Sequence, residues 1–391
     1  MKRLVFFLSI LLLSGCAAAP AETTAPEPVV EAAMTEPAPT ETEPVPTVTE
    51  PPPTEAPDPV RLMLNGMSLE ERVGQLFLAR CNAQTAVSDV ETYHLGGLVL
   101  FAQDFKGQAP DSFRETAAAY QAAAKIPLLL AVDEEGGTVT RISCYPAFRA
   151  NPFPSPRDAF AQGGLDLALT LEEEKCQLLS SLGIQVNLGP VCDMADDPSA
   201  FLYARSLGQD VQATSDFVAI TVRTMDAYSI GSVLKHFPGY GNNTDTHTGI
   251  AIDSRSLEDF TQRDLLPFAA GIEAGCDGIL VSHTIVEAFD NTLPASLSPA
   301  VHQYLREEMG FQGVILTDDL VMQAITDQYG SGEAAVLAVL AGNDMLCSTD
   351  YAVQYEAVLA AVLEGRIDID TLNAAAGRVL RWKMNLGLIP S

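Results

Sequence analysis

The chain has 391 residues, of which 47% are hydrophobic, and it carries a formal net charge of −29 at pH 7. An acidic excess of this size disfavours nucleic acid and anionic membrane surfaces as partners, because both carry like charge. The length exceeds that of a typical single domain, but one α/β barrel can accommodate most of it.

The first residues predict export. A short cationic start is followed by an apolar run from Leu4 to Leu13, which is too short for a membrane span but typical of a signal-peptide core. The run ends in Leu-Ser-Gly-Cys (13–16), which resembles the lipobox of bacterial lipoproteins. That resemblance implies removal of a signal peptide, residues 1–15, and a lipid on Cys16, anchoring the protein to the outer face of the bacterial cell membrane. An ordinary signal peptide with an incidental cysteine is the alternative.

The next segment, residues 16–59, is rich in Pro, Thr, Glu and Ala, and it contains nine acidic residues and no Lys or Arg. Frequent prolines block helix and sheet, and like charges repel, so we expect an extended, disordered linker. At the rise of a polyproline helix it could reach on the order of 100 Å. Its expected role is to hold a folded domain away from the bilayer.

From residue 60 to residue 391, short apolar runs alternate with helix-like segments. Strands that are apolar on both faces and alternate with helices are typical of a parallel sheet. Eight such runs predict one (β/α)8 TIM-like barrel. A doubly wound open sheet is the alternative, but no GxGxxG turn follows the first run. The expected strands are 75–81, 96–101, 126–133, 184–191, 232–239, 278–284, 313–319 and 344–350, and the clearest expected helices are 110–125, 166–183 and 216–228.

The six cysteines after Cys16 are scattered and include no CxxC pair. This pattern indicates neither a zinc site nor a dense disulfide framework. We expect buried thiols at several of these positions and no bound metal.

Polar residues fall at the carboxyl ends of several expected strands. Asp133 closes the third run and Asp318 the seventh, while Lys235 and His236 follow the fifth. Active sites of α/β barrels are built at this face, so we expect these side chains to lie close together. A carboxylate there can act as a nucleophile toward the anomeric carbon of a sugar, and Asp318 is a candidate for such a role, with capping of the following helix as the alternative. Its neighbour Asp319 is expected to accept backbone N–H groups instead.

The triplet Asp245-Thr246-His247 can supply a proton donor and acceptor. Side chains two residues apart in an extended loop point to the same side, so Asp245 can bind one imidazole nitrogen of His247 and leave the other facing a substrate. Histidine titrates near neutrality, which suits a group that acts first as acid and then as base. A turn-forming Asp beside a loop His, or part of a metal site, is the alternative.

Several segments together resemble the family 3 glycoside hydrolases, and specifically their β-N-acetylhexosaminidase branch. The branch signature, KHFPGHG followed by a DSH or DTH triplet, is matched by KHFPGYG and DTH within 235–247. The likeness covers nearly all of 60–391. Further similar segments are DEEGGTVTR (133–141), NLGPVCDM (187–194), ARSLG (204–208), GVILTDDLVM (313–322) and AGNDML (341–346).

The resemblance implies a role for each matching residue. Asp318 would be the nucleophile, and His247, paired with Asp245, the acid/base. Five charged or polar residues would hold the sugar hydroxyls: Asp133, Arg141, Arg205, Lys235 and His236. The chain departs from the branch at Tyr240, where the branch usually has His, and in the loop 241–245, which looks one residue shorter. These departures bear on the loop's geometry and on fine substrate preference.

The expected reaction is double displacement on a terminal β-linked N-acetylhexosamine, with retained configuration and without metal or organic cofactor. Peptidoglycan fragments or other glycans are the expected carbohydrate partners. The alternatives are an N-acetylglucosaminide phosphorylase, a β-glucosidase of the same family, and an inactive glycan-binding lipoprotein. Retention of Asp245, His247 and Asp318 disfavours the last.

Overall fold

The computed structural model describes residues 58–243, 245 and 249–390. Its central feature is a sheet of eight parallel strands, which are adjacent in the order β10-β1-β2-β3-β4-β5-β7-β9. The strands are β1 (Phe77–Arg80), β2 (Gly97–Leu100), β3 (Leu129–Val132), β4 (Val186–Asn187), β5 (Gly231–Phe237), β7 (Gly278–Val281), β9 (Val314–Thr317) and β10 (Leu346–Ser348). Each lies within one of the expected runs or extends it by one residue.

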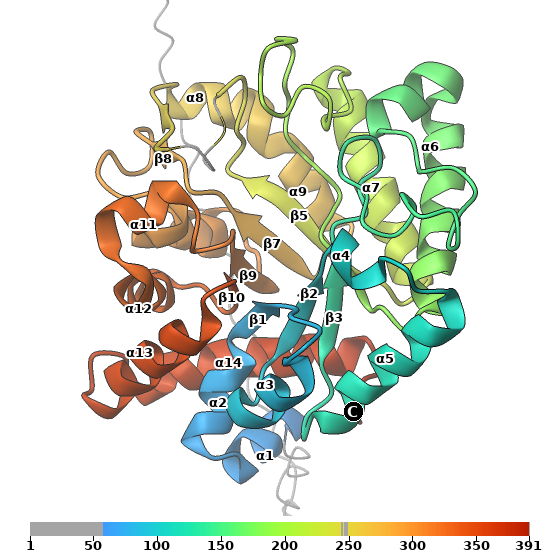
Figure 1. The fold of residues 1–391 in the computed structure, drawn as a ribbon. Helices are drawn as coiled ribbons and strands as arrows, with labels where there is room; N and C mark the ends of the chain where they lie inside the picture. The colour runs from blue at the N-terminus through green and yellow to red at the C-terminus, as the bar shows by residue number, and fades with distance from the viewer. Residues whose placement is uncertain (1–57, 244, 246–248, 391) are drawn as a thin grey trace, which may run out of the picture. The chain divides into compact units, whose positions relative to one another are not determined.

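The two edges of this sheet meet, so that it forms a nearly closed barrel (Figure 1). Leu316 of β9 pairs with Met345 in a parallel bridge, and the Thr317 N–H donates to the Met345 carbonyl at 3.1 Å. The strand order follows the chain order without the reversal that defines a doubly wound sheet. The predicted α/β barrel is therefore confirmed.

Helices surround the barrel (Figure 1). The three expected helices are α5 (Pro110–Ala123), α6 (Pro156–Ser181) and α7 (Val211–Ala227); α6 begins earlier than expected and is kinked at Gly163 and Gly164. The others are α1 (Pro59–Gly66), α2 (Leu69–Gln75), α3 (Ala86–Tyr93), α4 (Ala102–Phe105), α8 (Leu257–Asp259), α9 (Leu265–Glu273), α10 (Pro299–Gln303), α11 (Gln323–Tyr329), α12 (Ser331–Ala341), α13 (Tyr351–Leu363) and α14 (Ile369–Asn385).

Alternate residues of the strands fill the barrel interior. Leu78, Val99, Leu129 and Leu316 belong to one interior apolar cluster, while the residues between them pack beneath the helices. Helix α14 covers the amino-terminal end of the barrel, where the Trp382 ring lies against Gly231, the first residue of β5. The same alternation directs the side chains at the opposite ends of the strands into the barrel mouth: Arg80, Phe101, Asp133, Lys235 and Asp318.

Two further features bear on the predictions. A small parallel sheet, β6 (Ile252–Asp253) with β8 (Ile285–Val286), was not predicted and ties down the segment that follows β5. Among the helices that the structure describes, none has both the length and the apolar character needed to cross a bilayer. The six cysteines after residue 57 are free thiols, and four of them are buried.

Candidate active site

Charged side chains of opposite sign meet at the barrel mouth, on β5 and on the segments after β3 and β4. Lys235 Nζ lies 2.6 Å from Asp133 Oδ1 and 2.6 Å from Glu135 Oε1. Arg205 forms a bidentate pair with Glu135, in which Nε donates to Oε2 at 2.9 Å and Nη2 donates to Oε1 at 2.7 Å. The structure thus brings three of the predicted sugar-binding residues together around Glu135, which was not predicted.

Within this network, the pKa values of Glu135, Lys235 and Arg205 shift in the direction that favours their charged forms. Burial alone would raise the pKa of Glu135, but Lys235 and Arg205 outweigh burial and hold that pKa well below its usual range. Burial opposes the charge on Lys235, yet Asp133 and Glu135 raise its pKa above the ordinary value. Glu135 likewise raises the pKa of Arg205 against the effect of burial. Charged, prepositioned donors and acceptors of this kind bind sugar hydroxyls strongly.

His236 is oriented by Asp193, a buried carboxylate in the segment after β4. Asp193 Oδ2 lies 2.7 Å from His236 Nδ1 and accepts the His236 backbone N–H at 2.9 Å. On the other side of the ring, Arg205 Nη2 lies 3.2 Å from Nε2. Because a guanidinium can only donate, this arrangement assigns the proton to Nδ1 and leaves Nε2 as the acceptor. His236 and Lys235 are the last residues but one and two of β5, not residues beyond it.

Glu134 stabilises the turn after β3, which places Arg141 at the barrel mouth. Its buried carboxylate accepts the backbone N–H groups of Arg141 at 2.8 Å and Ile142 at 2.7 Å. The turn begins at Gly136, with φ of 103°, where a Cβ atom would meet the Pro154 carbonyl oxygen at 2.1 Å. As a result, Arg141 Nη2 lies 3.9 Å from Asp133 Oδ2, and its Nε is buried without a hydrogen-bond partner among the described residues.

Asp318 follows β9 and is partly exposed at the same mouth. Its Oδ1 accepts the backbone N–H of Asp319 at 2.8 Å. The Cys347 thiol of β10 lies close to the carboxyl ends of β3, β5 and β9, because charged residues at all three ends affect its pKa. Burial raises its pKa well above the usual value, and the carboxylates of Asp319, Asp318 and Asp133 raise it further, whereas Lys235 lowers it.

Asp319 has the structural role that was expected. Its Oδ1 accepts the backbone N–H groups of Val321 at 3.2 Å and Thr349 at 3.1 Å, and its Oδ2 accepts the Thr349 hydroxyl at 2.5 Å. It ties β10 to the turn after Asp318. His283 is also structural, because its ring nitrogens lie 2.7 Å from Ser296 Oγ and 3.0 Å from the Asp319 carbonyl oxygen.

The segment after β5 leads to the predicted acid/base pair. Asp245 is partly buried, and His247 lies outside the described residues, so their pairing stays a prediction. Tyr240 at the root of this segment is 1% exposed and packs with Leu202 and Ala195. Its backbone N–H donates to Asp193 Oδ1 at 2.8 Å. Tyr240 therefore contributes a buried aromatic ring to the packing at the root of this segment.

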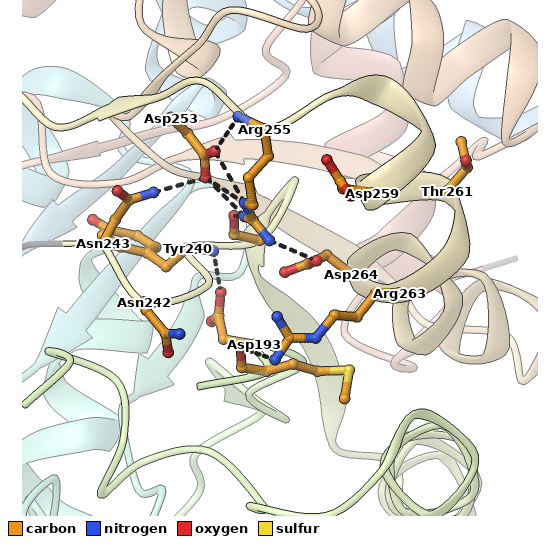
Figure 2. A network of polar contacts seen from close by, with 12 residues as sticks. Asp193, Tyr240, Asn242, Asn243, Asp253, Arg255, Asp259, Thr261, Arg263 and Asp264 are labelled. Atoms are coloured by element: carbon orange, nitrogen blue, oxygen red, sulfur yellow. Dashed lines mark hydrogen bonds and ion pairs between the residues drawn. The ribbon is translucent and has the colours of Figure 1, made fainter. Parts of the chain in front are cut away.

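A second ionic network holds the two ends of the same segment (Figure 2). Arg255 Nη2 lies 2.7 Å from Asp253 Oδ2, and Arg255 Nη1 lies 2.8 Å from Asp264 Oδ2. Asn243 Nδ2 also donates to Asp253 Oδ2, at 2.7 Å. These residues, with Glu135 and Asp193, were missed from the sequence, because only the fold shows which of the many charged residues become buried and paired.

The arrangement supplies part of what hydrolysis of a glycosidic bond requires. It offers a partly exposed carboxylate beside a preoriented set of charged donors and acceptors, whereas the predicted acid/base His247 is not among the described residues. Among residues 58–243, 245 and 249–390, no cluster of His, Cys, Asp and Glu has an arrangement that could hold a metal ion. Cys16 and residues 16–57 of the predicted linker lie outside the described residues, whereas the last two linker residues are part of the fold: Asp58 caps helix α1 and Pro59 begins it.

Comparisons with known proteins agree with this geometry. The Glycosyl hydrolase family 3 N terminal domain matches residues 68–382. The chain is 34% identical over 303 residues to a β-hexosaminidase of Xylella fastidiosa (strain M12), covering 75% of this chain and 84% of that protein. It is 35% identical over 306 residues to a β-hexosaminidase of Stenotrophomonas maltophilia (strain R551-3), with the same two coverages.

Solved structures show the same likeness. A family 3 β-N-acetylglucosaminidase from Paenibacillus sp. str. FPU-7 matches with a TM-score of 0.77 and 31% identity, over 82% of this chain and 63% of that one. LpqI of M. tuberculosis matches with a TM-score of 0.75 and 27% identity, over 83% of this chain and 96% of that one.

Proposed function

Because the chain belongs to glycosyl hydrolase family 3 and to its β-hexosaminidase branch, we propose that it is a retaining exo-β-N-acetylhexosaminidase. It removes a terminal β-linked N-acetylhexosamine from peptidoglycan fragments or other glycans. The observation that carries the proposal is the convergence at the barrel mouth of Asp318 with the network of Asp133, Lys235, Glu135 and Arg205.

In the first step of this mechanism, Asp318 attacks C1 of the bound sugar. The bond from C1 to the leaving oxygen breaks, and His247, oriented by Asp245, gives that oxygen a proton. The product of the step is a sugar bound covalently to the Asp318 carboxylate. His247 then takes a proton from water, which attacks C1 and releases the sugar with its original configuration. Lys235, Arg205 and Asp133 hold the ring through its hydroxyls during both steps.

A panel of aryl β-glycosides, assayed with and without phosphate, tests this proposal. We expect the N-acetylglucosaminide to be cleaved faster than the glucoside, with free sugar as the product in either buffer. Nuclear magnetic resonance should detect the β-anomer first. Faster cleavage of the glucoside would favour a β-glucosidase, formation of a sugar 1-phosphate would favour a phosphorylase, and no turnover of any glycoside would favour a glycan-binding protein.

We also propose that the protein is exported and anchored by a lipid on Cys16, with residues 16–59 as the linker. The apolar run, the Leu-Ser-Gly-Cys sequence and the proline-rich composition support this. Growth of the expressing bacterium with an alkyne-bearing fatty acid tests it. The full-length chain should become labelled and sediment with membranes, and Cys16→Ala should abolish both. Labelling that survives in the Cys16→Ala variant would refute the anchor.

A further inference from the structure

His283 is a buried histidine beside the proposed nucleophile that the mechanism above does not use. It lies two residues after β7 and is 0% exposed. Val281, the last residue of β7, pairs with Thr317 of β9, and its carbonyl accepts the backbone N–H of Asp318 at 3.1 Å. The end of β7 therefore lies alongside the turn that carries the Asp318 carboxylate.

The His283 ring binds that turn at its main chain. Nε2 lies 3.0 Å from the Asp319 carbonyl oxygen, and Nδ1 lies 2.7 Å from Ser296 Oγ. Because a carbonyl oxygen can only accept, Nε2 carries a proton and donates a hydrogen bond to Asp319. The Ser296 hydroxyl, which is also fully buried, can donate to Nδ1 and so hold the ring in this tautomer.

Ser296 is itself held in place from two sides. Its backbone N–H donates to the Ser282 carbonyl at 3.0 Å, and its carbonyl accepts a hydrogen bond of 2.8 Å from Asn343 Nδ2. Asn343 is only 1% exposed. The donor at His283 Nε2 is thus the end of a buried chain of hydrogen bonds. Its members cannot shift without losing a partner, which is costly in a protein interior.

Asp319 connects His283 to the nucleophile through its backbone. The Asp319 carbonyl accepts from His283, and the Asp319 N–H donates to Asp318 Oδ1 at 2.8 Å. The Asp319 side chain is fixed by the segment after β10, where its carboxylate accepts the Thr349 N–H and hydroxyl. A rotation of the Asp319 backbone would carry its N–H away from Asp318, and the hydrogen bond from His283 opposes this rotation.

We propose that His283 is a positioning residue for the nucleophile. It fixes the Asp319 backbone, whose N–H in turn sets the direction of the Asp318 carboxylate toward C1 of the sugar. Because His283 is fully buried, it acts through this backbone and not by contact with the substrate. Attack on C1 depends on distance and angle, and a shift of about 1 Å in a reacting group can cost on the order of 100-fold in rate. This inference rests on the proposed function, which makes Asp318 the attacking group.

Covalent trapping of the nucleophile measures this role. A 5-fluoro N-acetylglucosaminyl fluoride labels the carboxylate that attacks C1, and mass spectrometry of the full-length chain gives the labelling rate. We expect His283→Leu to label about 10- to 100-fold more slowly than the wild type, with kcat/KM on aryl glycosides lowered to a similar extent. The inhibition constant of free N-acetylglucosamine should stay unchanged, because the sugar-binding network around Lys235 is intact.

Conservative variants test whether the hydrogen bond carries the effect. His283→Gln has an amide that can still donate to the Asp319 carbonyl, so it should recover part of the labelling rate. Ser296→Ala removes only the partner of Nδ1 and should slow labelling by about threefold to tenfold. If His283→Leu does not fold, these two variants still make the comparison. Labelling of His283→Gln and Ser296→Ala at the wild-type rate would then overturn the inference.

A second buried histidine provides the control for stability. His302 is 2% exposed and lies 2.8 Å from the Ser298 carbonyl oxygen through Nδ1, and within the described part of the chain it forms no hydrogen bond with the turn 318–319. His302→Leu should lower the melting temperature and leave the labelling rate of the folded protein unchanged. Equal slowing of labelling in His302→Leu and His283→Leu would mean that both act through stability alone.

Hydrogen exchange tests the same link without turnover. His283→Leu should speed exchange of the Asp319 amide by about tenfold or more, whereas the amides of β9 should exchange as in the wild type. Unchanged exchange at Asp319, or labelling of folded His283→Leu at the wild-type rate, would overturn the inference and leave the proposed reaction standing. If the wild-type chain is never labelled at Asp318, the proposed reaction is wrong, while the exchange comparison still decides whether His283 fixes the turn.

Discussion

Asn243 donates a hydrogen bond of 2.7 Å to Asp253, and this contact closes the base of the segment 244–252 (Figure 2). Arg255 holds the same carboxylate through Nε and Nη2, and its Nη2 also donates to the Gly239 carbonyl at 3.2 Å. One arginine therefore fixes both ends of the segment in which the predicted acid/base pair lies.

If this contact positions the acid, Asn243→Ala should impair substrates with poor leaving groups more than activated ones. We expect kcat/KM for a disaccharide to fall about tenfold, the equivalent of one lost hydrogen bond to a charged group. Asn242→Ala is the matched control, because Asn242 donates to the exposed Asp196 at 2.7 Å and not to Asp253. Equal losses in the two variants would contradict a positioning role for Asn243.

Removal of the acid/base itself should also impair substrates with poor leaving groups more than activated ones, and by a larger factor. His247→Ala should slow a disaccharide far more than an aryl glycoside whose leaving group needs no proton. Asp318→Ala should instead lower kcat on both substrates by several orders of magnitude, because every substrate needs the nucleophile. Steady-state assays of the two substrates with each variant make the comparison. If His247→Ala lowers the rate equally on both substrates, His247 is not the acid.

The Arg255 network should also be a large source of stability. Its two carboxylate partners, Asp253 and Asp264, are only 2% and 1% exposed. Arg255→Ala leaves both of these buried charges uncompensated, which should cost about 3–5 kcal/mol in the free energy of unfolding. Urea titration measures this cost.

A surface arginine provides the control for that measurement. Arg366 pairs with Glu333 where both side chains are 45% exposed, so Arg366→Ala should lower the free energy of unfolding far less than Arg255→Ala does. If Arg255→Ala lowers the free energy of unfolding as little as Arg366→Ala does, water must enter the folded variant and solvate the carboxylates of Asp253 and Asp264.

The barrel could be predicted because its strands are apolar on both faces. A strand of this kind appears in the sequence as a short continuous apolar run, which can be recognised without knowledge of the fold. The mouth could be predicted in part for the same reason. Asp133 and Asp318 interrupt apolar runs, and a charge at a strand end is visible without knowledge of the fold. The two-residue strands β6 and β8 could not be predicted, because so short an element has no periodicity.

The supporting carboxylates could not be predicted either. In the run Asp-Glu-Glu (133–135), three acids look alike, but the fold sends Glu135 to Lys235 and Arg205, and Glu134 to the backbone of the following turn. Those partners are set by strand register and by which loops meet above the barrel. Asp193 looks like the exposed acids Asp196 and Asp197 in the sequence, but the fold buries it, where it binds His236 and the Tyr240 backbone N–H.

At the amino-terminal end of the barrel, away from the mouth, a buried lysine should make the stability of the protein depend on pH. Lys383 is 0% exposed, donates to Gln75 Oε1 at 2.6 Å, and has its pKa lowered by burial to about 7. In the unfolded chain its pKa is about 10.4. Between these values the unfolded state binds more protons than the folded state, so this group lowers stability progressively as the pH falls from about 10 to 7, and has no further effect below that.

Lys383→Met should therefore flatten the rise of unfolding free energy between pH 7 and pH 9.5. At pH 7 it should raise that free energy by on the order of a few kcal/mol. The unpaired Gln75 Oε1 costs the variant about 1–3 kcal/mol at every pH, which offsets the gain but leaves the slope unaffected. Lys106→Met, on an exposed lysine, is the control. Parallel curves for the wild type and Lys383→Met in urea titrations would show that Lys383 keeps its proton inside the fold, which would require water to reach the ammonium from below the barrel.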